Sequence, residues 1–312
     1  MFTITKLSRA IGADANIDLR KLAESKDPAV VAAVREAVQT HFVLRFRDQH
    51  LSADEFVGLA SAFGHTKTLK RATAATSAHL SSHPQIKVVS NVSIDGRPIG
   101  DGGSSENYWH TDGTYLPQPV ELTFLYGRES PKANPPKTFF MNLSDVHDRL
   151  PRYLTSYLSE LSCIHYSKYN FAPEYAEQIA ALPEGADRRH IGPSFPLVRR
   201  NPHSGRPSLY LPRQRQCLIE GLTSEESEKL SDLLWTYVEA YNDTWGDVIG
   251  VNDLFVFDNG YTLHRREAFD TSERRVLWHI ATEGEPPIPY GDGVLASGPR
   301  RSPGRSGNGE RA

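Results

Sequence analysis

Apolar residues along the chain repeat with two different periods, which predict where helices and strands lie. Residues 28–39 (PAVVAAVREAVQ) carry alanine and valine at helical spacing, and residues 41–48 (HFVLRFRD) then alternate apolar and polar side chains as a strand does. Residues 51–64 begin with Ser52 as a helix N-cap and Glu55 as its capping-box partner, and they end at a glycine. The N-terminal part is therefore predicted to form a helix, a strand and a second helix.

Strand patterns occur in two blocks that are far apart in the sequence. The first block contains residues 86–100, which include an Asp-Gly turn, and residues 107–115 and 120–130. The second block contains residues 247–269 and 274–284. A site built on these strands must therefore join residues from both blocks.

The region between the two blocks has a different pattern. The pattern of residues 144–182 predicts helices, most clearly over 144–161. Residues 183–208 are rich in Pro, Gly, Arg and Ser, which predicts long loops. Residues 223–242 predict an amphipathic helix. Its apolar positions are Leu230, Leu233, Leu234 and Val238.

This order of elements favours one fold class. A doubly wound parallel sheet needs regular alternation of strands and helices, which the chain lacks. The pattern predicts a mainly β protein with flanking helices, built as an antiparallel sandwich or jelly roll. Residues 1–290 are expected to form a single domain, and residues 291–312, rich in Gly, Ser, Pro and Arg, a disordered C-terminal tail.

Composition excludes several classes of protein. The 312 residues are 38% hydrophobic and 23% charged, and no apolar run reaches the ~20 residues of a membrane helix. A net charge of −3 gives no overall basis for binding nucleic acid or a membrane. Cys163 and Cys217 are too few for a disulfide framework or a thiolate metal cage. Because the N-terminus also lacks the apolar segment of a secretory signal, a cytoplasmic location is expected.

The segment 107–115 (NYWHTDGTY) places His110 and Asp112 two residues apart in a predicted strand. Side chains i and i+2 leave the same face of a strand, so both are expected on one side, as a solvated face or as a site. A metal site needs a third ligand, and the second block offers His264 and His279. Two imidazoles and one carboxylate form the facial triad of non-heme Fe(II) oxygenases, with zinc as the main competing metal.

Two motifs carry a family resemblance. Residues 109–115 (WHTDGTY) and 264–279 (HRREAFDTSERRVLWH) resemble the Fe(II)/2-oxoglutarate-dependent dioxygenases of the taurine dioxygenase and 2,4-dichlorophenoxyacetate dioxygenase (TauD/TfdA) family. Residues 43–64 and 199–227 are also similar to family segments, and the likeness covers roughly residues 40–285. It implies a double-stranded β-helix (jelly-roll) core.

The resemblance implies roles for five residues. His110 and Asp112 match the family's proximal metal ligands, and His264 matches the distal one. Arg275, eleven residues after His264, matches the arginine that holds the far carboxylate of 2-oxoglutarate. Arginine suits that role because its planar fork donates two parallel charge-assisted hydrogen bonds. Thr138 falls where the family places a threonine on the same carboxylate.

The sequence around the two predicted 2-oxoglutarate residues has its own features. The family's usual Gly-Gly before Thr138 is replaced by Pro136 and Lys137. Arg274 competes with Arg275, but alternation along a strand lets only one of them face inward, and the spacing from the distal histidine favours Arg275.

Four residues are predicted to face the substrate. Glu106 and Asn107 come just before the metal-binding strand, and Arg213 falls in a segment that lines the mouth of the site in the family. His279 lies four residues after Arg275 on the same strand face, where taurine dioxygenase has an arginine that binds a sulfonate. The histidine therefore disfavours taurine as the substrate. The alternatives are solvated loop positions for the first three residues and plain packing for His279.

The resemblance predicts an oxygenase that uses Fe(II), 2-oxoglutarate and O2 to oxidise a C–H bond of a small molecule, by hydroxylation or desaturation. No catalytic residue is expected beyond the metal centre. A natural-product intermediate is the substrate class favoured among those of the family. Two alternatives stay open, namely a protein of the same fold that binds metal and ligand without turnover, and a zinc hydrolase. The sequence predicts no oligomeric state.

Overall fold

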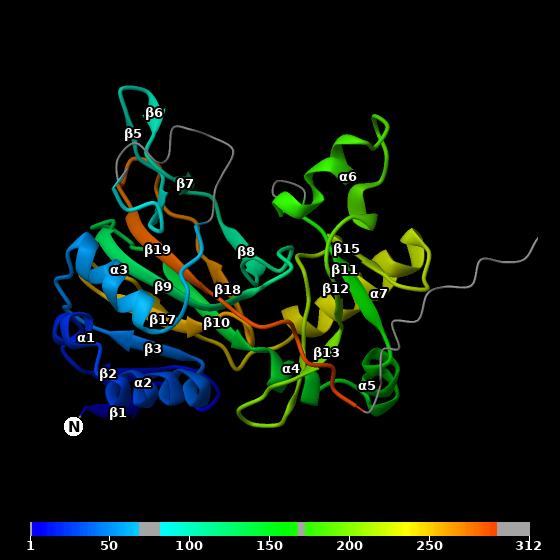
Figure 1. Cartoon of the computed structure of the whole chain (residues 1–312), viewed down its shortest axis with the longest axis horizontal. Helices are drawn as coiled ribbons and strands as arrows, with labels where there is room; N and C mark the ends of the chain where they lie inside the picture. Colours follow the sequence, from blue (N-terminus) through cyan, green and yellow to red (C-terminus); the bar gives the residue numbers. More distant parts are fainter. Residues whose placement is uncertain (1, 69–81, 168–171, 292–312) are drawn as a thin grey trace, which may run out of the picture.

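The computed structural model describes residues 2–68, 82–167 and 172–291, and the chain is mainly β with several helices (Figure 1). Strands from both ends of the chain share one large sheet in the left half of Figure 1, whereas residues 143–167 and 172–241 lie in the right half. The predicted C-terminal tail, except residue 291, lies outside the described residues. In the described ranges, none of the helices is long and apolar enough to cross a membrane.

The larger sheet joins the first and the last strands of the chain. Its strands lie in the order β1 (Thr3–Lys6), β2 (Ala13–Asn16), β3 (Val43–Phe46), β17 (Leu254–Asp258), β9 (Val120–Glu129), β19 (Val276–Glu283), β4 (Lys87–Ser90) and β7 (Asp101–Gly102). Neighbouring strands are antiparallel except β2 with β3 and β4 with β7. Every residue of the central strand β17 is buried. Its apolar run is continuous because both faces of the sheet are covered.

A smaller sheet packs against one face of the larger one. Its antiparallel strands lie in the order β16 (Trp245–Val248), β10 (Lys137–Asn142), β18 (Thr262–Arg266) and β8 (Asn107–His110). Phe140 of β10 packs on Phe255 and Phe257 of β17, with ring centroids 6.2 and 5.0 Å apart. Each fully buried phenylalanine stabilises the fold by roughly 1.5–3 kcal/mol. The pairing of β8 with β18 confirms that the two blocks of strands meet.

The N-terminal helices cover the opposite face of the larger sheet. They are α1 (Leu19–Ser25), α2 (Pro28–His41) and α3 (Ala53–Ala62). Their apolar side chains share one buried cluster with residues of β3, β9 and β17. The two helices predicted here are confirmed, and so is the capping box of α3, in which Ser52 and Glu55 exchange side-chain to backbone hydrogen bonds.

The right half of the molecule has an apolar cluster of its own. Its helices are α4 (Leu143–Asp148), α5 (Arg152–Ser159), α6 (Ala176–Ala180) and α7 (Ser224–Glu239), with 3-10 helices at Pro173–Tyr175 and Arg188–His190. Its strands are β11 (Ser162–His165), β12 (Ser194–Pro196), β13 (Val198–Arg200), β14 (Pro207–Leu209) and β15 (Cys217–Ile219). The predicted amphipathic helix is confirmed as α7, although Leu233 is 43% exposed.

Three expectations are wrong in detail. The strand predicted over residues 107–115 ends at His110. The pattern over 86–100 divides into β4 and a separate hairpin, β5 (Ser93–Ile94) with β6 (Arg97–Pro98), around the predicted Asp-Gly turn. The stretches expected to be helical or loop also contain β11 to β14. These strands are only three or four residues long, which is too short for local periodicity to give a signal. β11 pairs with the distant strands β12 and β15, whereas β13 and β14 pair with each other across a short loop.

Candidate metal centre

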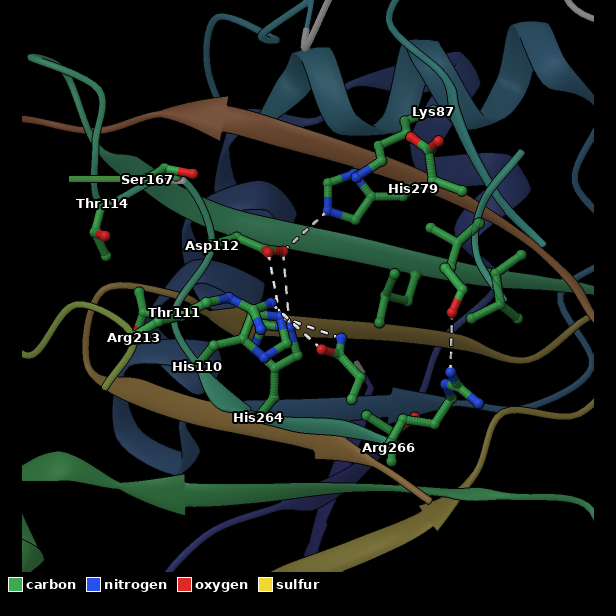
Figure 2. Close-up of a pocket in the computed structure, with 18 of the residues that line it drawn as sticks. Lys87, His110, Thr111, Asp112, Thr114, Ser167, Arg213, His264, Arg266 and His279 are labelled. Atoms are coloured by element: carbon green, nitrogen blue, oxygen red, sulfur yellow. Dashed lines mark hydrogen bonds and ion pairs between the residues drawn. The ribbon is translucent and has the colours of Figure 1, made fainter. Parts of the chain in front are cut away.

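Three side chains from both blocks of strands converge on one point. Ligand atoms of His110, Asp112 and His264 all lie within 4.8 Å of one another. His110 Nε2 is 3.5 Å from Asp112 Oδ1, and His264 Nε2 is 3.7 Å from Asp112 Oδ2 (Figure 2). Metal bonds of about 2.0–2.2 Å from nitrogen and oxygen ligands can span such separations. The donor set therefore fits one metal ion.

Asp112 lies in a turn and not in the strand that carries His110. Asn259 holds this turn, because its Oδ1 accepts from the Asp112 N–H and its Nδ2 donates to the Asp112 carbonyl, both at 2.9 Å. Gly113 follows at φ +65, and a Cβ there would lie 2.7 Å from Val120 Cγ2. The expectation that strand alternation aligns the histidine and the acid is therefore wrong, since a turn fixed from a distant loop brings them together.

The two histidines are neighbours across the strand pair β8 and β18. Their ring centroids are 4.1 Å apart. His110 Nδ1 lies 2.7 Å from the Tyr108 carbonyl, so the proton belongs on Nδ1 and the Nε2 lone pair faces the centre. His264 is flanked by the rings of Phe140 and Phe257, which restrict its orientation.

Electrostatics sets the charge of each ligand. Burial raises the pKa of Asp112, but the neighbouring imidazoles of His110, His264 and His279 outweigh it and hold that pKa well below its usual range. Burial, together with the neighbouring His110, lowers the pKa of His264 well below its usual range. The site therefore presents a carboxylate and a neutral distal imidazole, and both forms are competent metal ligands.

The convergence point opens into a cavity of about 410 Å³. The structure brings all nine residues singled out from the sequence to its wall. They are Glu106, Asn107, His110, Asp112, Thr138, Arg213, His264, Arg275 and His279.

One end of the cavity is suited to an anion. Arg275 is only 5% exposed, and its guanidinium donates no hydrogen bond to another described residue. Burial, with Arg266 nearby, lowers the pKa of Arg275 to about 9, which leaves it protonated at neutral pH. Thr138 lies on the same wall, opposite Arg266 across the strand pair β10 and β18. The competing Arg274 faces outward and pairs with Glu129 at 2.7 Å.

The residues predicted to face the substrate make contacts of their own. Glu106 pairs with Arg265 at 3.2 Å, and Asn107 Oδ1 accepts a hydrogen bond of 3.3 Å from Arg213. His279 Nε2 lies 3.3 Å from Asp112 Oδ2, as a dashed line in Figure 2 shows. Polar groups of this cavity thus already interact with one another.

Sequence reasoning missed three residues of the site. Asn259 gives no local signal, because its role depends on a turn 147 residues away. Lys87 lines the cavity beside His279 and looks like an ordinary strand lysine in the sequence. Arg266 lines it too and donates to the carbonyl of Ser105 at 2.6 Å. Its position two residues after His264, on the same strand face, could have revealed it.

Comparisons with known proteins agree on one family. The sequence model described as "Taurine catabolism dioxygenase TauD, TfdA family" matches residues 3–281. Pentalenolactone F synthase of Streptomyces arenae is 29% identical over 266 residues, which cover 82% of this chain and 87% of the relative. The (S)-phenoxypropionate/alpha-ketoglutarate-dioxygenase of Delftia acidovorans is 28% identical over 279 residues, which cover 83% and 88%.

A solved structure shows the same likeness. The crystal structure of a taurine dioxygenase from Burkholderia xenovorans superposes with a TM-score of 0.71 and 25% identity, over 92% of this chain and 91% of that one.

Proposed function

Because the chain belongs to the TauD/TfdA family, we propose that it is an Fe(II)- and 2-oxoglutarate-dependent oxygenase that oxidises a C–H bond of a small molecule. The observation that carries the proposal is the convergence of two imidazoles and one carboxylate at a cavity whose wall also contains the guanidinium of Arg275. The two relatives compared above are named as a synthase and a dioxygenase, which does not favour a zinc hydrolase or a protein without turnover.

His110, Asp112 and His264 would hold the iron. The donor set fits Fe(II), because two neutral imidazoles and one carboxylate occupy one side of the ion and leave the other positions open. When bound, the metal and O2 supply oxidative decarboxylation of 2-oxoglutarate to succinate and CO2, coupled to oxidation of the substrate. Asn259 would orient the carboxylate ligand by fixing its backbone.

Arg275 and Thr138 would hold the far carboxylate of 2-oxoglutarate. The Arg275 guanidinium lies at the wall of the cavity and donates no hydrogen bond to another described residue, which supports this role, since a buried cation gains most from an anionic ligand. Arg266 donates to backbone carbonyls and would shape this end of the cavity.

Glu106, Asn107, Arg213 and His279 would face the substrate. We expect a natural-product intermediate, because pentalenolactone F synthase is among the similar proteins and a histidine stands where taurine dioxygenase has its sulfonate-binding arginine. Arg213 and Lys87 add positive charge to the wall, which favours a substrate with an anionic group. Hydroxylation and desaturation are both compatible with this arrangement.

Three broader properties belong to the same proposal. We expect a double-stranded β-helix core, supported by the two packed sheets and the structural likeness to a taurine dioxygenase. We expect one oxygenase domain over residues 1–290, supported by a family match over nearly all of that range. A cytoplasmic location is supported by Cys163 and Cys217 being free thiols.

The test is 2-oxoglutarate turnover. Protein loaded anaerobically with Fe(II) is exposed to O2 and 2-oxoglutarate, alone and with candidate lactones or aryloxy acids, and succinate is quantified. We expect succinate with Fe(II), faster release with a true substrate, and none with Zn(II). Protein that binds Fe(II) at the triad but forms no succinate with any candidate, while Zn(II) supports hydrolysis, would contradict the proposal.

A further inference from the structure

His279 contacts a metal ligand from a strand that carries none of the ligands. Its Nε2 is 3.3 Å from Asp112 Oδ2, and its side chain is 5% exposed. Figure 2 shows its ring on the opposite side of the Asp112 carboxylate from His110 and His264. The histidine belongs to β19 of the larger sheet, whereas the two ligating histidines belong to the smaller sheet. The contact therefore joins the larger sheet to the turn that carries Asp112.

The hydrogen-bonding of the His279 ring indicates where its proton lies. Nδ1 is buried and has no hydrogen-bond partner among the described residues. If the proton were on Nδ1, the Nδ1–H group would be a buried donor without an acceptor. Nε2 would then carry no proton, and its lone pair would face a carboxylate oxygen, which is repulsive. The tautomer with the proton on Nε2 avoids both penalties, because Nε2–H then donates to Asp112. Strand pairing with Lys87 and Leu125 fixes the backbone from which the ring extends.

Asp112 needs such a restraint. Asn259 fixes its backbone, but rotation of a carboxylate about its terminal torsion is soft. Within the described part of the chain, the carboxylate contacts two predicted ligands, and His279 is the further residue that contacts it. Groups that hydrogen-bond to ligating carboxylates orient them for the metal.

We propose that His279 is a positioning residue that holds the Asp112 carboxylate in its metal-binding orientation by donating an Nε2–H hydrogen bond to Oδ2. This role rests on the proposed function, since it presumes that Asp112 binds the metal. It differs from substrate binding, because its effect is present when no substrate is bound.

The test measures metal binding without turnover. Co(II) is titrated anaerobically into the wild type, His279→Gln and His279→Leu, and the dissociation constant and visible d–d spectrum are recorded. Glutamine keeps an N–H donor near the position of Nε2, whereas leucine removes it. His165→Leu is the matched control, because it makes the same change at another buried histidine that does not line the cavity. Neither ring nitrogen of His165 has a hydrogen-bond partner among the described residues, so no contact to a metal ligand is lost.

We expect His279→Leu to raise the Co(II) dissociation constant about 10–100-fold and to alter the spectrum, as loss of a hydrogen bond to a ligand does. His279→Gln should stay within a few-fold of the wild type, and His165→Leu should not weaken binding. If His279→Leu does not fold, His279→Phe replaces it, since it keeps a ring without a donor.

Different outcomes separate this inference from the function. Equal affinity of the leucine variant and the wild type overturns the positioning role, and so does glutamine binding as weakly as leucine in a folded protein. A wild type that binds no Co(II) at the triad overturns the proposed function first.

Discussion

Two clusters in this protein contain the same three residue types, and they differ in what surrounds them. The metal cluster lies between the larger and the smaller sheet, and it includes His264, Asp112 and Arg275. The second cluster lies where the right half of the molecule meets the end of β17, and it consists of His165, Asp258 and Arg199. We call it the tyrosine cluster because two tyrosine rings pack against its arginine.

Aromatic rings fill the space around the tyrosine cluster. His165 stacks on Tyr210 with ring centroids 4.7 Å apart. The Arg199 guanidinium lies 4.0 Å from the centroid of Tyr210 and 4.1 Å from that of Tyr261. Burial lowers the pKa of His165 to about 3 and raises that of Asp258 to about 7. Both nitrogens of His165 lack a hydrogen-bond partner in the described ranges, so this histidine packs as a neutral ring.

The metal cluster differs in having room at its centre. Its histidine and acid place donor atoms within 4.8 Å of one another, and all three members line the cavity of about 410 Å³, whereas no member of the tyrosine cluster lines it. Burial and residue type are thus shared by both clusters. Donor atoms that converge on accessible space are what make a functional site.

The largest expected difference between the clusters is in the effect of replacing His264 or His165. His264→Ala should abolish Fe(II) binding and lower succinate formation by more than about 100-fold, because even groups that merely support metal ligands contribute 10–100-fold. His165→Ala should leave the rate per folded molecule unchanged and lower the free energy of unfolding by about 2–4 kcal/mol, as loss of a packed side chain does. Iron stoichiometry, succinate formation and urea unfolding measure the three quantities. Iron retained by His264→Ala would show that the clusters do not differ in this way.

A second difference concerns Arg275. Arg275→Lys should raise the KM for 2-oxoglutarate about 10–100-fold, because lysine cannot reproduce two parallel hydrogen bonds, and a charge-assisted hydrogen bond contributes about 1.5–3 kcal/mol. Arg274→Lys is the matched control, since that neighbour is 57% exposed and pairs with Glu129 on the surface. It should change the KM less than about two-fold, as exposed ion pairs contribute little. Steady-state kinetics at saturating O2 measures both, and similar effects at the two positions would contradict the assignment.

The sequence predicts the parts of this comparison that depend on short-range patterns. Capping residues and apolar periodicity correctly locate α2, α3 and α7, because these signals lie within each helix. Alternation correctly separates Arg274 from Arg275, since adjacent residues of an extended chain face opposite ways. The family resemblance singled out residues that the structure places on one cavity wall.

Long-range contacts explain what the sequence could not predict. Asp112 looks like a strand residue, but Asn259, 147 residues away, holds it in a turn. The contact between His279 and Asp112 spans 167 residues, so no local pattern encodes it. Leu233 fits the apolar face of α7 by spacing, yet 43% of it stays exposed because its neighbours cover only part of the helix. Such outcomes depend on which surfaces meet in the folded chain.

A smaller effect separates the clusters by pH. The folded-state pKa of His165 is about 3, below the usual value of 6.5. As pH falls below 6.5, His165 therefore becomes protonated in the unfolded chain but stays neutral in the folded protein. The His165 contribution to stability is therefore lost on acidification, by about 2 kcal/mol between pH 7 and pH 5, at ~1.4 kcal/mol for each pH unit. Proton uptake by Asp258 in the folded state, at its raised pKa of about 7, opposes this loss over the same range. His165→Phe should remove the His165 part of the slope. Urea unfolding of both proteins from pH 7 to pH 5 measures it, and parallel slopes would show that His165 is not the group responsible.

The smallest expected effect concerns Arg199, the counterpart of Arg275. Arg199→Lys should lower the free energy of unfolding by about 1 kcal/mol, because a lysine ammonium cannot stack flat between two rings and a desolvated cation–π contact contributes up to about 2 kcal/mol. The KM for 2-oxoglutarate should stay unchanged, since Arg199 does not line the cavity. Urea unfolding and steady-state kinetics on the same preparation measure both. A raised KM in a stably folded Arg199→Lys protein would mean that the tyrosine cluster acts on the cofactor site, and the two clusters would then have to be treated as one.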